Sequence, residues 1–577
     1  MQITWRETER NIEAETLLAR ELGIRPLTAR LLTNRGLTKP AEAESFLKPS
    51  LSNLHDPFLL PDMDKAARRI CDALSNNERI FVHGDYDVDG VTSTAVYVRT
   101  LAKLGANLIY RVPHRHVDGY DLRTKSIEWA HEQGAKLVIT TDCGIQAQEA
   151  VALANSFGMT VIITDHHEPG DTLPDAYAVV NPRRRDSTYP FPHLAGVGVA
   201  YKTMQAVVRL TKPEWEISFL RGYLDLVACG TVADVMPLQG ENRIFASFGL
   251  EALRTTKKAG LRALIEGASI DSSQRLTADS VAFGIAPRIN AIGRLDDAGI
   301  ALDLMLTTDA SEAGRLAGLL GDANLERQKT QRRITAEAVM QVVQKGLNKR
   351  SIIIVAAPNW NPGVVGIVAG KLVDQFSRPA IVIAVTEDGA WGKGSARSIP
   401  AFDMFEGVSL CRDLLVSCGG HSLAAGLSLD MKLFDSFVDR LTTHASSVLT
   451  EEDFTPQIRL DAILDAQQID IPLLEEWAQL EPYGEDNPAP TLASRSAKIA
   501  GFRRIGKDQS HFKANMEFGQ GAAKWTADAV AWGKADDWET LAGAGGVVEV
   551  AYTPSINTYN GRRSVQLSLK DLRAAGG

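Results

Sequence analysis

Short apolar runs alternate with amphipathic stretches in the first third of the chain. We expect strands at the apolar runs 79–83, 107–112, 137–141, 160–164 and 178–181. The stretches between them have the spacing of amphipathic helices, at roughly 91–104, 124–133 and 146–157. Strands that alternate with helices predict a largely parallel α/β sheet. Ligand groups in such sheets gather beyond the C-terminal ends of the strands.

The first of these apolar runs ends in a cluster of carboxylates and one imidazole. Within seven residues the chain places His83, Asp85, Asp87 and Asp89. Gly84 and Gly90 allow the backbone to turn tightly, so the carboxylates can converge. Ionised carboxylates this close repel one another, and a divalent cation relieves that repulsion. Taken alone, the cluster could also be a solvated acidic loop or a calcium loop.

Other apolar runs lead to groups of the same kind. These groups are Asp142 after 137–141, Asp165, His166 and His167 after 160–164, and Asp234 after 224–227, which we interpret as a strand. A single acid at a strand end is usually a cap or turn residue, but several such ends predict a shared site for two divalent ions. Oxygen ligands favour Mn2+ or Mg2+, and histidine favours Mn2+. Two such ions suit displacement at phosphorus.

Composition limits the class of protein. A chain of 577 residues is too long for one core and predicts roughly three or four domains. Five scattered cysteines indicate a reducing cytoplasm rather than a disulfide framework. No apolar run reaches the length of a membrane span, and the N-terminus lacks a signal core. With a net charge of −9, attraction to nucleic acid must come from local patches and bound metal.

The second half changes character twice. Residues 311–346 predict a long connector helix, and strands near 351–355 and 380–384 with a helix at 363–376 predict a second α/β domain. From about 455 the strands are short, and Asn560-Gly561 is a strong hairpin signal. Such strands predict a small barrel of OB type, which binds single strands through basic and aromatic side chains.

Two features of the second α/β domain suit an anion. The hydroxyl of Ser395 and the guanidinium of Arg397 are two residues apart and can bind one phosphate together. The run Gly419-Gly420-His421 can let backbone N–H groups approach an anion closely. Gly-rich turns are common and an arginine can belong to a buried ion pair, so each feature alone is weak.

The motifs, taken in order, resemble those of the DHH phosphoesterases. The segment 83–90, Asp142, 165–167 and 233–234 resemble motifs I to IV of that family. Further matches are 112–115 with 118–120, 194–198, 287–294 and, in the companion DHH-associated domain, 395–398 and 419–426. The resemblance runs from about residue 15 to the C-terminus, and motifs in this order are far more specific than Asp-His-His alone.

The resemblance implies a fold with two α/β domains, DHH and DHHA1, joined by a long helix and followed by an OB-type β-barrel. The expected parts are an N-terminal helical segment 1–75, the DHH catalytic domain 76–310, the connector helix 311–346, the DHHA1 domain 347–450 and the OB-fold domain 455–577.

Within the family the chain looks like the bacterial exonucleases that degrade single-stranded DNA. That likeness implies metal-dependent 5′→3′ release of 5′-mononucleotides in DNA repair and recombination. It also implies single-stranded DNA with a 5′ end as substrate, a single-strand-binding protein and a RecQ-type helicase as partners, and a monomer in the bacterial cytoplasm, associated with the nucleoid and not with a membrane. The alternatives are a phosphodiesterase for short oligonucleotides or cyclic dinucleotides, and a non-catalytic single-strand-binding relative.

The resemblance also implies roles for individual residues. The metal ligands would be Asp85, Asp87, Asp142, His166 and Asp234, with His83 and Asp89 as ligands or as supports of the ligands. His167 would lie beside the scissile phosphate, and Arg288 and Arg294 would face the strand. The 5′-phosphate pocket would contain Arg115, Ser395, Arg397, Gly419, Gly420 and His421. The chain departs from the usual pattern at Cys143, where Asn is common, and at Asp121, where Gly is common.

Overall fold

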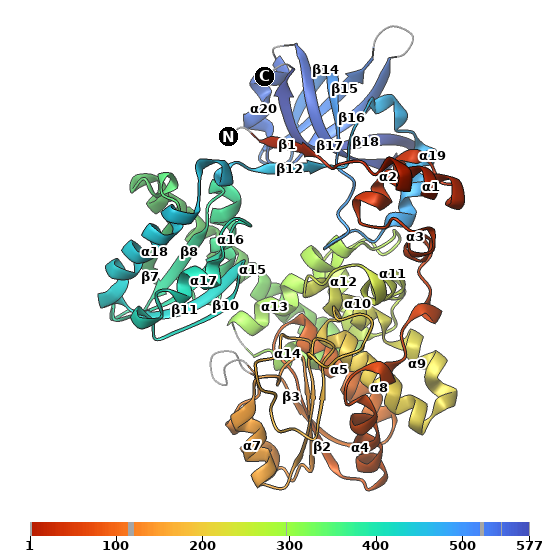
Figure 1. The fold of residues 1–577 in the computed structure, drawn as a ribbon, viewed down its shortest axis with the longest axis vertical. Helices are drawn as coiled ribbons and strands as arrows, with labels where there is room; N and C mark the ends of the chain where they lie inside the picture. Colours follow the sequence, from red (N-terminus) through yellow and green to blue (C-terminus); the bar gives the residue numbers. More distant parts are fainter. Residues whose placement is uncertain (1–2, 114–120, 296, 520–523, 544, 576–577) are drawn as a thin grey trace. The chain divides into compact units, whose positions relative to one another are not determined.

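The computed structural model describes residues 3–113, 121–295, 297–519, 524–543 and 545–575 (Figure 1). The chain forms two compact units. One contains residues 5–286, 302–310 and 458–577, and the other contains 1–4, 287–301 and 311–457. No helix in these described ranges is both long enough and apolar enough to span a bilayer.

A five-stranded parallel sheet organises the first half of the larger unit. Its strands lie in the order β3 (Asn107–Arg111), β2 (Arg79–His83), β4 (Leu137–Thr141), β5 (Thr160–Thr164) and β6 (Ala178–Val180). Helices α6 (Thr124–Glu132) and α7 (Gln148–Ser156) pack on one face, and α5 (Val88–Lys103) and α8 (Gly196–Thr211) contact the other. Because both faces are covered, the strands are continuous apolar runs. The predicted parallel α/β sheet is confirmed.

The predicted strand at 224–227 is wrong. Residues Leu224–Ala233 form helix α10, so Asp234 follows a helix. Leu224–Val232 is buried throughout, and a short apolar run that is buried on all sides has no periodicity that separates strand from helix. Gly230 permits the close packing, since a Cβ there would lie 2.6 Å from Asp89 Oδ1 and 2.7 Å from Val197 Cγ1.

The C-terminal part of the larger unit is a closed barrel. Its strands lie in the order β14 (Leu492–Ile505), β15 (His511–Phe518), β16 (Trp525–Ala531), β18 (Arg562–Ala574) and β17 (Val547–Tyr559), and β17 pairs again with β14. The predicted hairpin is present, because Tyr559 pairs with Arg562 across Asn560 and Gly561, which both have positive φ. The predicted OB-type barrel is confirmed.

The N-terminal helices share the core of this barrel. Residues of α1 (Ile12–Leu22), α2 (Pro26–Asn34) and α3 (Pro40–Leu47) pack in one apolar cluster with α19 (Ile471–Trp477) and the barrel strands. Strand β1 (Thr4–Glu7) pairs with β12 (Gln457–Leu460). Helices α4 (Met63–Ser75), α11 (Gly240–Arg254) and α12 (Ala259–Gly267) also belong to this unit.

The smaller unit is built on a mixed sheet. Its strands lie in the order β10 (Ser417–His421), β11 (Ala424–Asp430), β9 (Trp391–Arg397), β8 (Ala380–Val385) and β7 (Ile353–Pro358). Helix α15 (Ala310–Gln344) is the predicted long connector, and it packs with α16 (Val365–Phe376) on one face of β7 and β8. Helices α17 (Met404–Ser409) and α18 (Phe434–Val448) cover the other face. Helices α13 (Ala286–Leu295) and α14 (Gly299–Leu306) precede the connector.

Candidate metal centre

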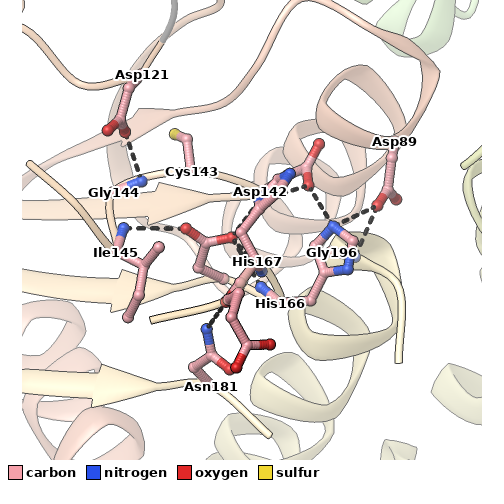
Figure 2. A network of polar contacts seen from close by, with 12 residues as sticks. Asp89, Asp121, Asp142, Cys143, Gly144, Ile145, His166, His167, Asn181 and Gly196 are labelled. Atoms are coloured by element: carbon pink, nitrogen blue, oxygen red, sulfur yellow. Dashed lines mark hydrogen bonds and ion pairs between the residues drawn. The ribbon is translucent and has the colours of Figure 1, made fainter. Parts of the chain in front are cut away.

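Three neighbouring strands of the parallel sheet bring the predicted site residues together. In the β2–β4–β5 order, His83 pairs with Thr140 and Thr141 pairs with Thr164, so the carboxyl ends of these strands meet at one edge. The segments that follow carry Asp85 to Asp89, Asp142, and Asp165 to His167. Figure 2 shows Asp89, Asp142, His166 and His167 of this set. Asp234 reaches the same edge from the C-terminal end of α10.

These side chains form three overlapping groups whose ligand atoms lie within 4.8 Å of one another. The groups are Asp85, Asp87 and Asp142; Asp142, His166 and His167; and Asp89, His166 and Asp234. Asp142 belongs to two groups, which suits a carboxylate that bridges two ions.

His166 is at the centre of the contacts. Its Nε2 lies 3.0 Å from Asp142 Oδ1, 3.6 Å from Asp234 Oδ2 and 3.7 Å from Asp89 Oδ2. Asp142 Oδ1 and His166 Nε2 are buried, and apart from their contact with each other neither has a hydrogen-bond partner among the described residues. Buried polar atoms of this kind are normally satisfied, so their convergence fits a divalent cation.

The electrostatics of the acidic residues also fit a cation. Burial and neighbouring carboxylates raise the pKa values of Asp85, Asp89 and Asp142 well above their usual range. Burial and the charge of Asp87 raise the pKa of Asp234 to about 7. Burial, together with His167, lowers the pKa of His166 to about 3, so its imidazole is neutral and able to bind a metal. Bound cations would replace the protons that these carboxylates otherwise retain.

The backbone holds the acidic residues in place. Asp87 caps α5 by accepting the N–H of Gly90 at 3.1 Å. Asp89 accepts the N–H groups of Gly196 and Val197 at 2.7 and 2.8 Å, at the N-terminus of α8 (Figure 2). Asp142 has a φ of 60°, a strained conformation that is concentrated at functional sites.

Asp165 pairs with His167, a contact that the sequence did not reveal. Its Oδ1 lies 2.7 Å from His167 Nδ1, and its Oδ2 accepts the N–H of Ile145 at 3.0 Å. Although burial lowers the pKa of His167, the hydrogen bond and charge of Asp165 raise it to about 9. In the absence of metal, Asp165 thus favours the imidazolium form of His167. Asp165 belongs to the Asp-His-His triplet, and that position was the only signal in the sequence.

His83 and the two departures from the family pattern lie around the groups. His83 is fully buried at the end of β2 and belongs to none of the three groups formed by the described residues. Burial raises the pKa of the Cys143 thiol well above its usual value, so it stays protonated and poorly reactive. Asp121 has a φ of 72°, a conformation that favours glycine, and it accepts the N–H of Gly144 at 2.7 Å.

In the smaller unit, most of the residues predicted to bind the 5′-phosphate lie on one face of the sheet. Ser395 pairs with Gly426, which pairs with Gly419, and Arg397 pairs with Ala424, which pairs with His421. Paired residues project from the same face, so Ser395, Arg397, Gly419 and His421 lie together. Arg397 Nη1 donates to Ser395 Oγ at 3.2 Å, and a Cβ at Gly366 of α16 would lie 2.8 Å from that hydroxyl. Gly420 projects from the opposite face.

Of the three remaining predicted arginines, the structure describes only Arg288 completely. Arg288 lies in α13 and is half-buried, and burial lowers its pKa. Arg294 also lies in α13, but its side chain is outside the described residues, as is the whole of Arg115.

Comparisons with known families agree with this geometry. Three family models match: the DHH family N-terminal domain over residues 79–231, the DHHA1 domain over 349–447, and the RecJ OB domain over 460–571. A parallel sheet with an acidic and histidine cluster at its carboxyl edge therefore defines a DHH phosphoesterase.

Individual relatives extend the match along the whole chain. The single-stranded-DNA-specific exonuclease RecJ of Bacillus subtilis (strain 168) is 40% identical over 554 residues, which cover 96% of this chain and 69% of that protein. RecJ of Salmonella typhimurium is 35% identical and covers 98% of both chains. The crystal structure of Thermus thermophilus RecJ with Mn2+ matches with a TM-score of 0.83 at 32% identity, and the match covers 100% of this chain and 80% of that one. The structure of the same RecJ with Mg2+ matches with a TM-score of 0.76 at 30% identity, and the match covers 100% of this chain and 79% of that one. The chain belongs to the RecJ family.

The raised pKa of Asp234 predicts that the stability of the metal-free protein decreases as the pH rises. The folded protein binds this proton up to a pH of about 7, whereas the unfolded chain releases it near pH 4. Between these values the folded state holds more protons, so we expect the free energy of unfolding to fall as the pH rises. Thermal melts at pH 5 and pH 8 in EDTA measure this fall, and excess Mn2+ should remove it. An Asp234→Asn variant should show a smaller fall, and melts in EDTA that do not change with pH would contradict the expectation.

Proposed function

We propose that this protein degrades single-stranded DNA from the 5′ end and releases 5′-mononucleotides, with two divalent ions at the candidate metal centre. The chain is a metal-dependent exonuclease of single-stranded DNA, as its RecJ relatives are named, and Mn2+ or Mg2+ is its cofactor. The observation that carries the proposal is the convergence of Asp85, Asp87, Asp142, His166 and Asp234 at one sheet edge. The direction of digestion, the product and the number of ions are the parts of the proposal that the names of the relatives do not state.

Each ion has a natural set of ligands among these residues. Asp85, Asp87 and Asp142, which form one of the three groups, would hold the first ion. We assign the second ion to Asp142, His166 and Asp234, because His166 Nε2 lies 3.0 Å from Asp142 Oδ1 and 3.6 Å from Asp234 Oδ2. Asp89 is fixed by two backbone N–H groups, so we assign it to the support of His166 and Asp234. His83, at the end of β2, would support the segment 84–87 that carries Asp85 and Asp87. When bound, such ions activate water and neutralise charge on the phosphate.

In the proposed reaction, the protein itself supplies a proton donor, His167, beside the phosphate. Asp165 favours the protonated form of His167 through Nδ1 and fixes the orientation of its ring. The side chain of His167 is 41% exposed, so the imidazolium can donate to a phosphate oxygen or to the departing 3′-oxygen. In a 5′→3′ reaction that oxygen belongs to the released mononucleotide.

An exonuclease must also fix the terminus of its substrate. We assign this role to the Ser395–Arg397 face, where Gly419 and Gly426 have open space at the Cβ position and leave backbone accessible to a phosphate. We assign Arg288, Arg294 and Arg115 to contacts with the strand itself. The buried end of Arg397 has no acidic partner among the described residues, and burial lowers its pKa, so a phosphate would supply the missing charge.

Replacing Arg397 tests the end-reading face. Arg397→Ala should reduce the preference for 5′-phosphorylated over 5′-hydroxyl strands by about 10- to 100-fold, the range of a charge-assisted hydrogen bond. The measurement is kcat/KM on both substrates. Lys371→Ala, which removes an exposed cation of α16, is the matched control and should keep the preference. An Arg397→Ala variant with unchanged preference would remove this residue from the pocket.

Several further expectations stay predictions. They are the domain bounds 1–75, 76–310, 311–346, 347–450 and 455–577, docking of a single-strand-binding protein or a RecQ-type helicase, a monomeric state, and a location in the bacterial cytoplasm at the nucleoid. The alternatives, hydrolysis of short oligonucleotides or cyclic dinucleotides and a non-catalytic binding role, are not favoured, because the curated relatives are named as exonucleases specific for single-stranded DNA and the match includes the barrel.

One digestion tests the proposed direction and substrate. Single and double strands labelled at the 5′ or the 3′ end are incubated with Mn2+, Mg2+ or chelator. We expect the 5′ label to appear at once as mononucleotide from single strands, only with metal. Immediate release of the 3′ label, or equal digestion of duplex, would contradict the proposal.

A further inference from the structure

A second pocket lies in the DHH part of the chain, away from the metal centre. Its volume is about 230 Å³, and it lies between the C-terminal end of α5, helix α8 and the short helix α9 (Glu216–Gly222). Three cations and three aromatic rings line it: Arg99, Lys103, Lys258, Trp215, Phe219 and Tyr223. No acidic side chain of the described residues is part of this lining. The lining therefore favours an anion that carries a planar ring.

The cations are held in place by their neighbours. Arg99 Nε and Nη2 donate to the carbonyl oxygen of Met305 at 2.9 and 2.6 Å. Lys258 Nζ is fixed by the carboxylate of Asp225 and the carbonyl of Gly222. Lys103 is exposed, and its Nζ lies 4.8 Å from the centre of the Trp215 ring, with no carboxylate partner among the described residues. Lys103 is thus the cation with a charge available to a ligand.

The aromatic side chains and the volume of the pocket limit the kind of ligand that it can bind. Trp215 and Tyr223 are half-buried, and cations lie over both rings: Lys103 at 4.8 Å and Lys212 at 5.9 Å from the centre of Trp215, and Lys258 at 5.6 Å from the centre of Tyr223. Lys103 and Lys212 are exposed and can move aside, so the Trp215 face can stack on a base, a contact that every nucleobase can make. A volume of about 230 Å³ is below the range of drug-sized pockets. The cavity therefore holds at most part of one nucleotide, such as its base, and leaves the phosphate at the opening beside the exposed Lys103.

Three helices connect the pocket to the metal centre. Helix α5 begins at the Asp87 cap and ends at Lys103, about 24 Å away by helical rise. Helix α8 holds Asp89 through its first N–H groups, and its Val208 lines the pocket. Helix α10 runs the opposite way, from its N-cap Tyr223 to its C-cap Asp234. The pocket is a site distinct from the metal centre, at the other end of the helices that position it.

We propose that this pocket binds a nucleoside 5′-phosphate. The proposed exonuclease releases such a product, and in this respect the inference rests on the proposed function. The two nucleotide sources are the free mononucleotide and a nucleotide within a strand, and we assign the free one because the cavity holds no more than a single unit. A ligand there contacts the ends of α5 and α8, so its occupancy should change the rate at the metal centre.

Binding is tested on the full-length Asp142→Ala variant in EDTA, where metal-dependent binding at the catalytic centre is removed and cleavage is not needed. Calorimetric titration with dAMP should give saturable binding to one site. Lys103→Glu or Trp215→Ala in the same background should weaken it at least about tenfold, whereas Lys257→Glu, which changes the exposed neighbour of Lys258, should not. Deoxyadenosine should bind more weakly than dAMP. Equal dAMP affinity in the Lys103→Glu and Lys257→Glu variants would overturn the site, and Lys103-dependent binding of an oligonucleotide but not of dAMP would overturn its assignment to the free nucleotide.

The rate on single-stranded DNA with Mn2+ gives the second readout. Saturating dAMP should change the rate of the wild type more than that of Lys103→Glu. An equal change in both proteins would assign the effect to product at the metal centre and would overturn the link through the helices.

Discussion

Asp142→Ala is expected to lower exonuclease turnover by about 10³-fold or more, because Asp142 belongs to two of the three ligand groups and its loss disturbs both ions. Single-strand binding should persist, since the barrel and the smaller unit are untouched. The measurement is release of mononucleotide from a 5′-labelled single strand with Mn2+.

The stability of the same variant separates loss of a ligand from loss of the fold. In EDTA, the variant lacks a buried carboxyl group whose charged form is disfavoured by burial and by the neighbouring Asp89 and Asp87, so the melting temperature should stay close to that of the wild type. The rise in melting temperature that Mn2+ gives the wild type should shrink. Asp171→Ala removes an exposed carboxylate of the same domain and should keep full turnover. Turnover close to that of the wild type in Asp142→Ala would remove Asp142 from the metal centre.

Arg243→Leu is expected to give the largest loss of stability. Arg243 of α11 is buried and donates to the carbonyls of Phe46, Gln479, Leu480 and Glu481. Its guanidinium also lies 3.6 Å from the centre of the Phe46 ring. Removing it leaves several buried carbonyls without a donor, at a cost of about 3–5 kcal/mol in the free energy of unfolding. Urea unfolding measures this loss.

A surface arginine of the same helix is the control for that measurement. Arg254 lies at the end of α11 and pairs with Glu251 three residues before it. Arg254→Leu should leave the unfolding midpoint nearly unchanged, because an exposed ion pair contributes little. If both variants unfold at the wild-type urea concentration, the carbonyls around Arg243 are satisfied in another way.

The parallel sheet could be predicted because its strands are buried on both faces and differ sharply from the helices between them. The prediction was wrong at 224–227, where α10 is apolar on all sides and packs closely through Gly230. The packing of α1–α3 into the barrel core joins residues more than 400 positions apart, as in the hydrogen bond from Trp477 Nε1 to Thr28 Oγ1. Periodicity along the chain contains no information about such long-range pairing.

The candidate metal centre was predictable in its residues and less so in its arrangement. Aspartate and histidine after strands were visible in the sequence, but the grouping depends on the β2–β4–β5 order, which brings Asp142 between the other two loops. The pairing of Asp165 with His167, and of Asp89 with the start of α8, depends on side-chain direction and backbone geometry. These contacts distinguish supports from ligands, a distinction that residue types do not provide.

Anomalous diffraction from crystals soaked in Mn2+ tests the central claim most directly. We expect two anomalous peaks at the carboxyl edge of the parallel sheet, one within reach of Asp85, Asp87 and Asp142 and the other within reach of Asp142, His166 and Asp234. Crystals of Asp142→Ala should lose at least one of these peaks. Manganese bound elsewhere, with no peak among these side chains in the wild type, would contradict the account.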